Sequence, residues 1–142
     1  MKIKIPLRLV EPEDDSYHLA AASVFEDGTT GFWIVDTGAS KSVFDKNLKD
    51  YFIASSEKKD TVHTTGITDK PLKTTLACMK PFSIGKLNVP DLEVALIDLT
   101  HINDFYPDSA EFKICGMLGG DFLMEHEAII DYQKKILILK VS

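Results

Sequence analysis

Apolar and polar residues alternate along much of this chain, a pattern typical of β-strands with one buried face. The first segment, KIKIPLRLV, has isoleucine or leucine at nearly every second position, and Pro6 places it at a sheet edge or an interface. The segment SYHLAAASVF predicts a second strand, and Asp27-Gly28 is a hairpin signal before the apolar run GFWIV. The chain is therefore predicted to begin with three strands.

The rest of the chain predicts short strands with little helix. Threonine-rich arms at about residues 62–75 surround Thr65-Gly66 and predict a projecting hairpin. Asp45 is predicted to cap a short helix through KNLKDYF. The polar and aromatic segment at about 100–113 is interpreted as a surface insertion or a short helix. A hairpin, a strand, a helix and two final strands are predicted from FSIGKLNV, LEVALIDL, DFLMEHE, AIIDY and ILILKV.

Composition and charge narrow the class of protein. With 44% apolar and 27% charged residues, the chain fits a single domain over residues 1–142. A formal charge of -6 with scattered basic residues argues against nucleic-acid binding, because phosphate affinity comes from clustered lysine and arginine. The apolar runs are too short to span a membrane. Because the first residues lack a signal-type apolar block, we expect a cytoplasmic protein, or an exported one if a signal was trimmed ahead of Met1.

The cysteines and histidines indicate neither a metal site nor a cofactor. Cys78 and Cys115 match no metal or redox spacing and are interpreted as buried free thiols. The four histidines are dispersed, and the chain has neither a glycine-rich phosphate loop nor a serine-hydrolase elbow. We therefore expect chemistry carried by side chains alone.

One apolar run ends in a charged residue. Residues 32–35, Phe-Trp-Ile-Val, lead directly into Asp36, which is followed by Thr-Gly-Ala-Ser. A carboxylate at the end of a buried strand is costly unless it is hydrogen-bonded, paired or used in chemistry. Asp-Thr-Gly alone is a weak signal, but far downstream Met117-Leu118-Gly119 again ends an apolar strand in glycine. The two blocks together indicate a functional site.

These two blocks resemble the motifs of the retropepsin-like aspartic proteases. Residues 34–39 match the family's hydrophobic-hydrophobic-Asp-Thr-Gly-Ala motif, and residues 117–119 match its hydrophobic-hydrophobic-Gly motif, which precedes a short helix. The resemblance covers most of the chain in order. It implies a mainly β fold, a closed antiparallel β-barrel with a flap hairpin at about 62–75, and an aspartic endopeptidase that acts on an extended polypeptide.

The chemistry of such an enzyme requires two carboxylates that share a proton. One activates a water as a base, and the other protonates the peptide carbonyl as an acid. The chain contains a single Asp-Thr-Gly, so the second Asp36 must come from the other subunit of a homodimer. The resemblance also places the KIKIPL and ILILKV strands near the subunit interface.

The resemblance assigns roles to the residues around Asp36. Gly38 and Gly119 support the active-site loop by allowing close backbone approach. Thr37 supports it through a hydroxyl that bonds across the subunit interface. The positions expected to bind substrate are Ala39, Ser40, Thr65, Gly66 and Ile67.

Two positions depart from the retroviral pattern. Those relatives carry Asp at the position of Ser40 and Arg at that of Gly120, a charge pair that braces the site. Their joint absence suggests a different brace. Asp121, at the start of the predicted helix, is interpreted as its N-cap, and Trp33 as core packing.

Two other functions stay open. One is a non-catalytic module that keeps the fold for peptide binding or dimerisation. The other is a small β-barrel subunit in which Asp36 only caps its own turn. The intact motif favours the enzyme, because loss of catalysis usually removes the need for a buried acid.

Overall fold

The structure is a computed structural model that describes residues 1–13, 15–55, 61–62, 72–73, 75–104 and 113–141. The strands are β1 (Lys2–Glu13), β2 (Ser16–Phe25), β3 (Thr30–Val35), β4 (Val43–Asp45), β5 (Phe52–Ala54), β6 (Thr61–Val62), β7 (Leu72–Lys73), β8 (Leu76–Met79), β9 (Phe82–Ile84), β10 (Leu87–Val89), β11 (Glu93–Ile97), β12 (Ile114–Leu118), β13 (Ile129–Asp131) and β14 (Ile136–Lys140). The helices are α1 (Thr100–Asp104), α2 (Gly120–Glu125) and a 3-10 helix (Lys49–Tyr51). The prediction of a mainly β fold with short helices is confirmed.

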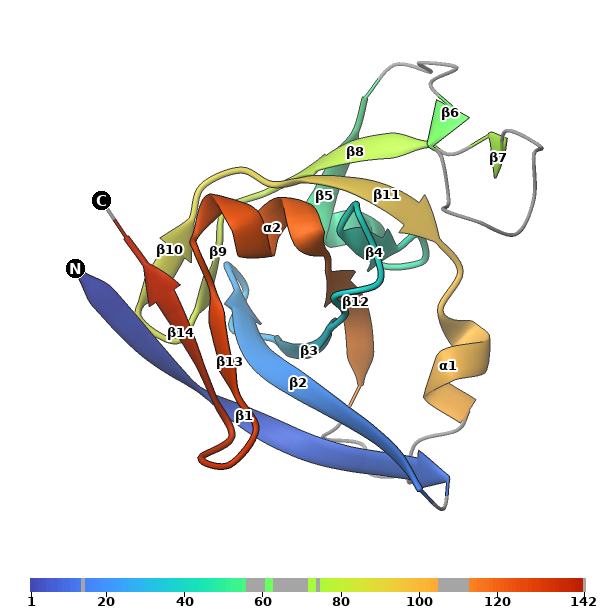
Figure 1. The fold of residues 1–142 in the computed structure, drawn as a ribbon. Helices are drawn as coiled ribbons and strands as arrows, with labels where there is room; N and C mark the ends of the chain where they lie inside the picture. The colour runs from blue at the N-terminus through green and yellow to red at the C-terminus, as the bar shows by residue number, and fades with distance from the viewer. Residues whose placement is uncertain (14, 56–60, 63–71, 74, 105–112, 142) are drawn as a thin grey trace.

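One path of hydrogen-bonded strands runs in the order β13-β14-β1-β2-β3-β12-β4-β11-β8-β5, and the β9–β10 hairpin joins it at β2 (Figure 1). Most ladders are antiparallel, but β12 runs parallel to β3, and β11 runs parallel to β4. Among the described strands no ladder joins β13 to β5, so the path is open. The predicted closed barrel is not confirmed, because β13 folds back on β14 and β5 on β8 at the two ends of the path.

The core lies where the apolar face of β1 and β2 meets β3, β9, β10, β12 and α2. The predicted alternation along β1 is confirmed as far as Leu7, since Ile3, Ile5 and Leu7 are buried while Lys2 and Lys4 are exposed. It was wrong at Leu9, which was expected on the same face but is 41% exposed, whereas Val10 is buried. In this arrangement every second side chain of the strand is apolar and is removed from water. The burial of these side chains is the main contribution to the stability of such a sheet.

Trp33 stands at the centre of the core and is completely buried. Its ring stacks on Phe82 with ring centroids 5.4 Å apart. Its Nε1–H donates to the Ser23 hydroxyl, which in turn donates to the Gly31 carbonyl, so the polar edge of the indole is satisfied. The interpretation of Trp33 as core packing is confirmed, and the strand that leads to Asp36 has a rigid base.

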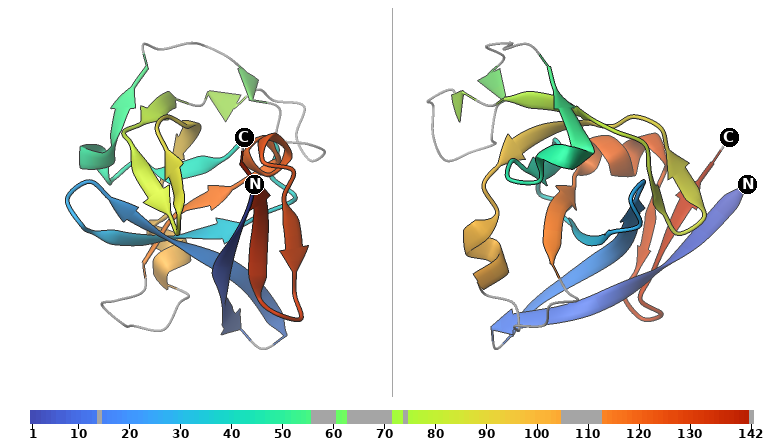
Figure 2. Two further views of the ribbon diagram at one scale, coloured as in Figure 1. Left: turned by 90° about the vertical axis from the view of Figure 1, so that its left-hand side faces the viewer. Right: turned by 180° about the vertical axis from the view of Figure 1, so that it is seen from behind.

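The two ends of the chain lie side by side (Figure 2). β1 pairs with β14 from Lys2↔Lys140 to Pro6↔Ile136, and β14 pairs on its other side with β13. The terminal strands therefore bond to each other within one chain. Their expected position near a subunit interface stays a prediction.

Two predicted segments are described only in part. β6 and β7 pair antiparallel, which gives the predicted hairpin a base, whereas Thr65, Gly66 and Ile67 lie outside the described residues. α1 forms the start of the expected 100–113 segment, and residues 105–112 lie outside the description.

The helix predicted after Asp45 is shorter than expected, and Asp45 does not cap it. Asp45 ends β4, and its carboxylate accepts hydrogen bonds from the backbone and side-chain amides of Asn47. The chain forms only the three-residue 3-10 helix, which has no side-chain cap. Neither α1 nor α2 has the length and apolar character that a membrane crossing needs, and the other described residues contain no such helix.

Candidate active site

Asp36 is placed by two strands that run side by side. β3 and β12 are parallel, and their ladder ends with Val35 opposite Leu118. The N–H of Asp36 then donates to the carbonyl of Leu118 at 2.9 Å. Because parallel strands end at the same edge of a sheet, the two sequence blocks that end in Asp36 and Gly119 meet there. The resemblance of the two blocks to family motifs implied this meeting of distant segments.

The Asp36 carboxylate is only partly tied down. Its Oδ1 accepts a hydrogen bond from the N–H of Gly38 at 3.0 Å, and the N–H of Ala39 donates to the carbonyl of Asp36 at 3.3 Å. Among the described residues nothing donates to Oδ2, and the residue is partly exposed. The turn orients the carboxylate and leaves one of its oxygens without a donor in the described part of the chain.

The loop that starts at Asp36 is clamped by the start of α2. The N–H of Gly120 donates to the carbonyl of Ala39 at 2.6 Å, and the N–H of Asp121 donates to that of Ser40 at 3.1 Å. A Cβ on Gly119 would lie 2.8 Å from the Ala39 oxygen, closer than real contacts allow. The expectation that Gly119 permits close backbone approach is confirmed.

Gly38 behaves differently from Gly119. A Cβ at this position would meet only the Asp36 carboxylate within this chain, at an ordinary contact distance of 3.4 Å. The described chain therefore does not require glycine here on steric grounds, contrary to the argument made from the sequence.

A buried polar cluster forms the brace between the two loops. The Asp121 carboxylate accepts hydrogen bonds from both the N–H and the hydroxyl of Ser42, at 2.9 and 2.8 Å. The Ser42 hydroxyl also accepts one from the N–H of Gly119 at 2.9 Å. Ser42 is completely buried, so each of these bonds satisfies a group that water cannot reach.

This brace corrects one interpretation and supplies a residue that the sequence did not reveal. Asp121 does not cap α2; the N-cap is Gly119, which has no side-chain cap bond. Ser42 was not predicted at all, because it lies 79 positions from Asp121 and no local pattern links the two. The expectation of a brace other than the retroviral charge pair is supported: Ser40 and Gly120 take part through backbone groups, and Ser42 with Asp121 through side chains.

The other predicted positions divide by location. Thr37 and Ser40 are exposed, Ala39 is partly exposed, and all three lie on the Asp36 loop. No hydrogen bond of the Thr37 or Ser40 hydroxyl occurs among the described residues. Next to them Lys41 forms an ion pair with Glu93 on β11 at 2.7 Å, which ties the end of the loop to the neighbouring strand.

The cysteines lie outside this loop. Cys115 on β12 is buried, and burial raises the pKa of its thiol well above the ordinary value. Cys78 is exposed on β8 between the buried Ala77 and Met79, so its interpretation as a buried thiol was wrong. The described part of the chain contains no group of three histidine, cysteine, aspartate or glutamate side chains placed to hold a metal ion.

Comparison with protein families decides the class of this site. The family model described as aspartyl protease matches residues 21–122, which include both Asp36 and Gly119. The chain belongs to the aspartyl protease family. No curated protein sequence matches it.

Two solved structures share the fold. A crystal structure of a retropepsin-like aspartic protease from Rickettsia conorii superposes with a TM-score of 0.52 at 20% identity, covering 98% of this chain and 90% of that one. The retroviral protease-like domain of Ddi1 from Leishmania major gives a TM-score of 0.53 at 16% identity, covering 88% of each chain. These likenesses establish a retropepsin-like fold for this aspartyl protease family member.

Proposed function

We propose that the protein is an aspartic endopeptidase whose active site contains two Asp36 carboxylates, one from each subunit of a homodimer. The observation that carries the proposal is the state of Asp36 itself. It ends a rigid buried strand, its loop is clamped by α2, and yet one carboxylate oxygen has no donor among the described residues. A carboxylate that is fixed in position but has one oxygen without a hydrogen-bond donor is suited to act as a catalytic acid or base.

The second carboxylate of the pair does not come from the same chain. Asp121 is the acid within the clamp, and its Oδ1 accepts hydrogen bonds from the two Ser42 donors. A second Asp36 across a two-fold axis supplies an identical group in an identical setting. Two such carboxylates at close range share one proton, so one acts on the water as a base while the other acts on the peptide carbonyl as an acid.

The substrate we propose is an extended polypeptide. A chain in this conformation is held mainly by its backbone, as an added strand. Ala39 and Ser40 form the floor beside Asp36 in this proposal. The hairpin based on β6 and β7, with Thr65, Gly66 and Ile67, covers the bound chain as a flap. Thr37 gives its hydroxyl to the partner subunit.

The test is cleavage of an unfolded polypeptide such as denatured casein, followed across pH. We expect activity at acidic to mildly acidic pH, because one carboxylate of the pair must hold a proton. A statine-type inhibitor should block it, and a chelator should leave it unchanged. Activity that persists at alkaline pH or disappears with a chelator contradicts the mechanism.

The same assay separates the non-catalytic alternative. A peptide-binding module binds the statine-type inhibitor or the polypeptide without any turnover at any pH. A protein in which Asp36 is only structural binds neither, and Asp36→Asn changes nothing but stability.

A further inference from the structure

The three-stranded sheet β13-β14-β1 is covered on one face only. Ile3 and Ile5 of β1 and Leu137 and Leu139 of β14 are buried in the core, so the residues between them point outward. The helix α2 packs on the buried side, and α1 packs against a separate apolar cluster. Neither of these helices covers the outward face.

The register of the two ladders defines the residues of this outward face. Residues directly opposite each other on neighbouring strands share a face. The face consists of three rows, which are Lys2 with Lys140, Lys4 with Ile138 and Ile129, and Pro6 with Ile136 and Asp131.

The apolar residues of the face form one continuous strip. Ile129 lies opposite Ile138, Ile136 is two positions from Ile138 on β14, and Pro6 lies opposite Ile136. Ile129 is 49% exposed, and Ile136 and Ile138 are half-buried. Among the described residues, neither of the β14 isoleucines belongs to an apolar cluster of the core. Sheets normally bury such residues against a second layer.

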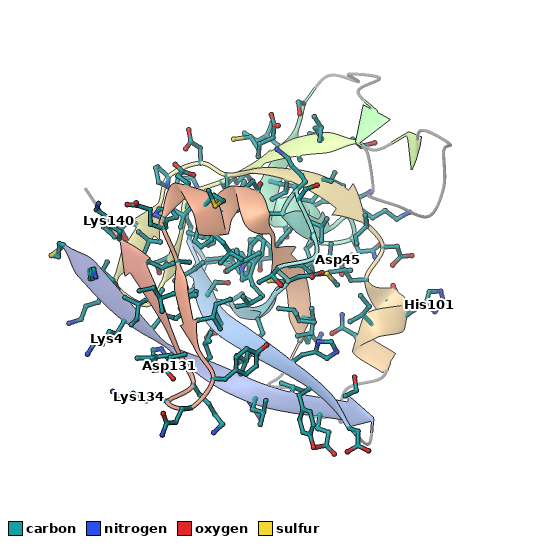
Figure 3. The ribbon with its side chains drawn as sticks, viewed as in Figure 1. Lys4, Asp45, His101, Asp131, Lys134 and Lys140 are labelled. Atoms are coloured by element: carbon teal, nitrogen blue, oxygen red, sulfur yellow. The ribbon has the colours of Figure 1, made fainter. Side chains whose placement is uncertain are left out.

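Lysines surround this strip. Lys2, Lys4 and Lys140 lie on the face, and the exposed Lys134 and Lys135 lie at the turn between β13 and β14. Figure 3 shows Lys4, Lys140 and Asp131 on the three strands and Lys134 at the turn. With the two acids Asp131 and Glu127, the five lysines give this region a charge of +3, whereas the whole chain has a formal charge of -6.

The first row sets two of these lysines directly opposite each other. Like charges in that position destabilise a sheet. Glu127 forms an ion pair with Lys140 at 3.0 Å, but in the described part of the chain no acid pairs with Lys2 or Lys4. A carboxylate supplied by another molecule would remove this repulsion. The charges of the face are therefore complementary to an acidic partner.

We propose that this face binds an amphipathic helix of a partner polypeptide, with apolar residues on the isoleucine strip and carboxylates beside the lysines. The inference goes beyond the proposed function and does not depend on it. Three strands of up to five residues give a face about 10 Å wide between the outer strand axes and about 17 Å long. A helix is about 10 Å in diameter and spans that length with about 11 residues. One helix of about three turns covers the face.

Two other occupants fit the face less well. A lipid layer is bound by apolar side chains that insert into it, whereas Ile136 and Ile138 are half-buried between their neighbours. A second copy of this chain has the same positive charge on the same face. Pairing the two faces across a two-fold axis would bring like charges together.

The experiment measures the binding of two helical peptides to the full chain at neutral pH by fluorescence anisotropy. Each has about 14 residues with a stripe of leucines, flanked by glutamates in one peptide and by lysines in the other. We expect the acidic peptide to bind at least about tenfold more tightly, and added salt to weaken it by screening the charges. Because the whole chain is acidic, non-specific attraction would favour the basic peptide instead.

Matched substitutions locate the binding site. Lys4→Glu should raise the dissociation constant of the acidic peptide about tenfold, whereas Lys49→Glu, the same charge change on the exposed face of the 3-10 helix, should change it less than about twofold. Ile129→Ala should raise it about threefold or more by removing apolar contact, and Ile53→Ala, at a 64% exposed position on β5, should leave it unchanged. Thermal unfolding checks that each variant is folded.

Several results would overturn the proposal. Equal binding of the two peptides, or equal effects of Lys4→Glu and Lys49→Glu, would show that the lysines of this face do not select an acidic helix. Binding to phosphatidylserine vesicles that Lys4→Glu abolishes, without binding of the acidic peptide, would assign the face to a lipid surface. Self-association in sedimentation equilibrium that the acidic peptide does not reduce and Lys4→Glu alters would assign it to a second copy.

Discussion

Two aspartates stand at equivalent points of the fold and differ in how they are bonded. Asp36 follows the last residue of β3, and Asp98 follows the last residue of β11. The Asp98 Oδ1 accepts hydrogen bonds from the hydroxyl of Thr100 at 2.6 Å, from its N–H at 3.0 Å, and from the Asn47 amide at 3.0 Å. The Asp36 carboxylate accepts one hydrogen bond from the described residues, from the N–H of Gly38.

The difference shows what distinguishes a structural acid from a candidate for catalysis. Asp98 accepts three hydrogen bonds from its own chain, all on Oδ1, and these bonds hold the start of α1 against the loop after β4. The loop of Asp36 is also held by hydrogen bonds, but most of these join backbone groups around it, and among the described residues only the Gly38 N–H donates to the carboxylate. The described part of the chain fixes the position of the Asp36 carboxylate and leaves one of its oxygens available to bind a water or a proton.

The largest expected effect comes from removing each acid in turn. Asp36→Asn should lower proteolytic activity by about 10²- to 10⁴-fold, because Asn neither holds the shared proton nor acts as a base. Asp98→Asn should leave activity close to that of the wild type. The measurement is the initial rate on denatured casein at acidic pH. Equal losses would remove the contrast between the two residues.

A smaller effect is expected from the brace beneath Asp36. Ser42→Ala leaves the Gly119 N–H without its acceptor and the Asp121 carboxylate without one donor, in a buried place, and should lower the free energy of unfolding by about 1–3 kcal/mol. The matched control is Ser40→Ala, at an exposed hydroxyl, with an expected change within about 0.5 kcal/mol. Urea denaturation of both variants measures the difference. A Ser42→Ala protein as stable as the control would show that the brace contributes little to the free energy of unfolding.

The smallest effect concerns acid stability. The Thr100 hydroxyl, then the Thr100 N–H and the Asn47 amide, lower the pKa of Asp98 from its ordinary 3.8 to about 2. Because the folded state favours the ionised form, this stabilisation is present above pH 3.8 and is lost as the pH falls toward about 2. Asp98→Asn should therefore make the unfolding temperature less dependent on pH in that range. A curve parallel to that of the wild type would contradict the assignment.

Local pattern was enough to predict the strands, and the resemblance to a family predicted the meeting of the two motifs. The alternation along β1 indicated its buried face as far as Leu7, and the apolar runs ending at Asp36 and Gly119 indicated two strand ends. What the pattern does not contain is the partner of each strand. The closed barrel was expected from resemblance, whereas the ends of the path are set by which strands fold back on each other.

The side-chain brace was beyond the reach of the sequence for a related reason. Asp121 has the residue type and position of a helix cap, and Asp45 those of a helix start, so local preference predicted both as caps. In the folded chain Asp121 accepts hydrogen bonds from Ser42, 79 positions away, and this tertiary contact decides its role. Asp45 accepts hydrogen bonds from Asn47, two positions along the chain, so one local bond replaces another there. Residue type and position do not fix the partner of a short polar side chain that can bond in more than one direction.

The central claim is that one active site contains Asp36 from two subunits, and mixing subunits tests it most directly. Wild-type and Asp36→Asn chains are combined at constant total protein, and native mass spectrometry of differently tagged chains verifies that subunits exchange. If each site needs two intact Asp36 residues, activity follows the square of the wild-type fraction, so an equal mixture retains about one quarter of the activity. A linear decline, with about one half retained and exchange verified, would contradict the shared site.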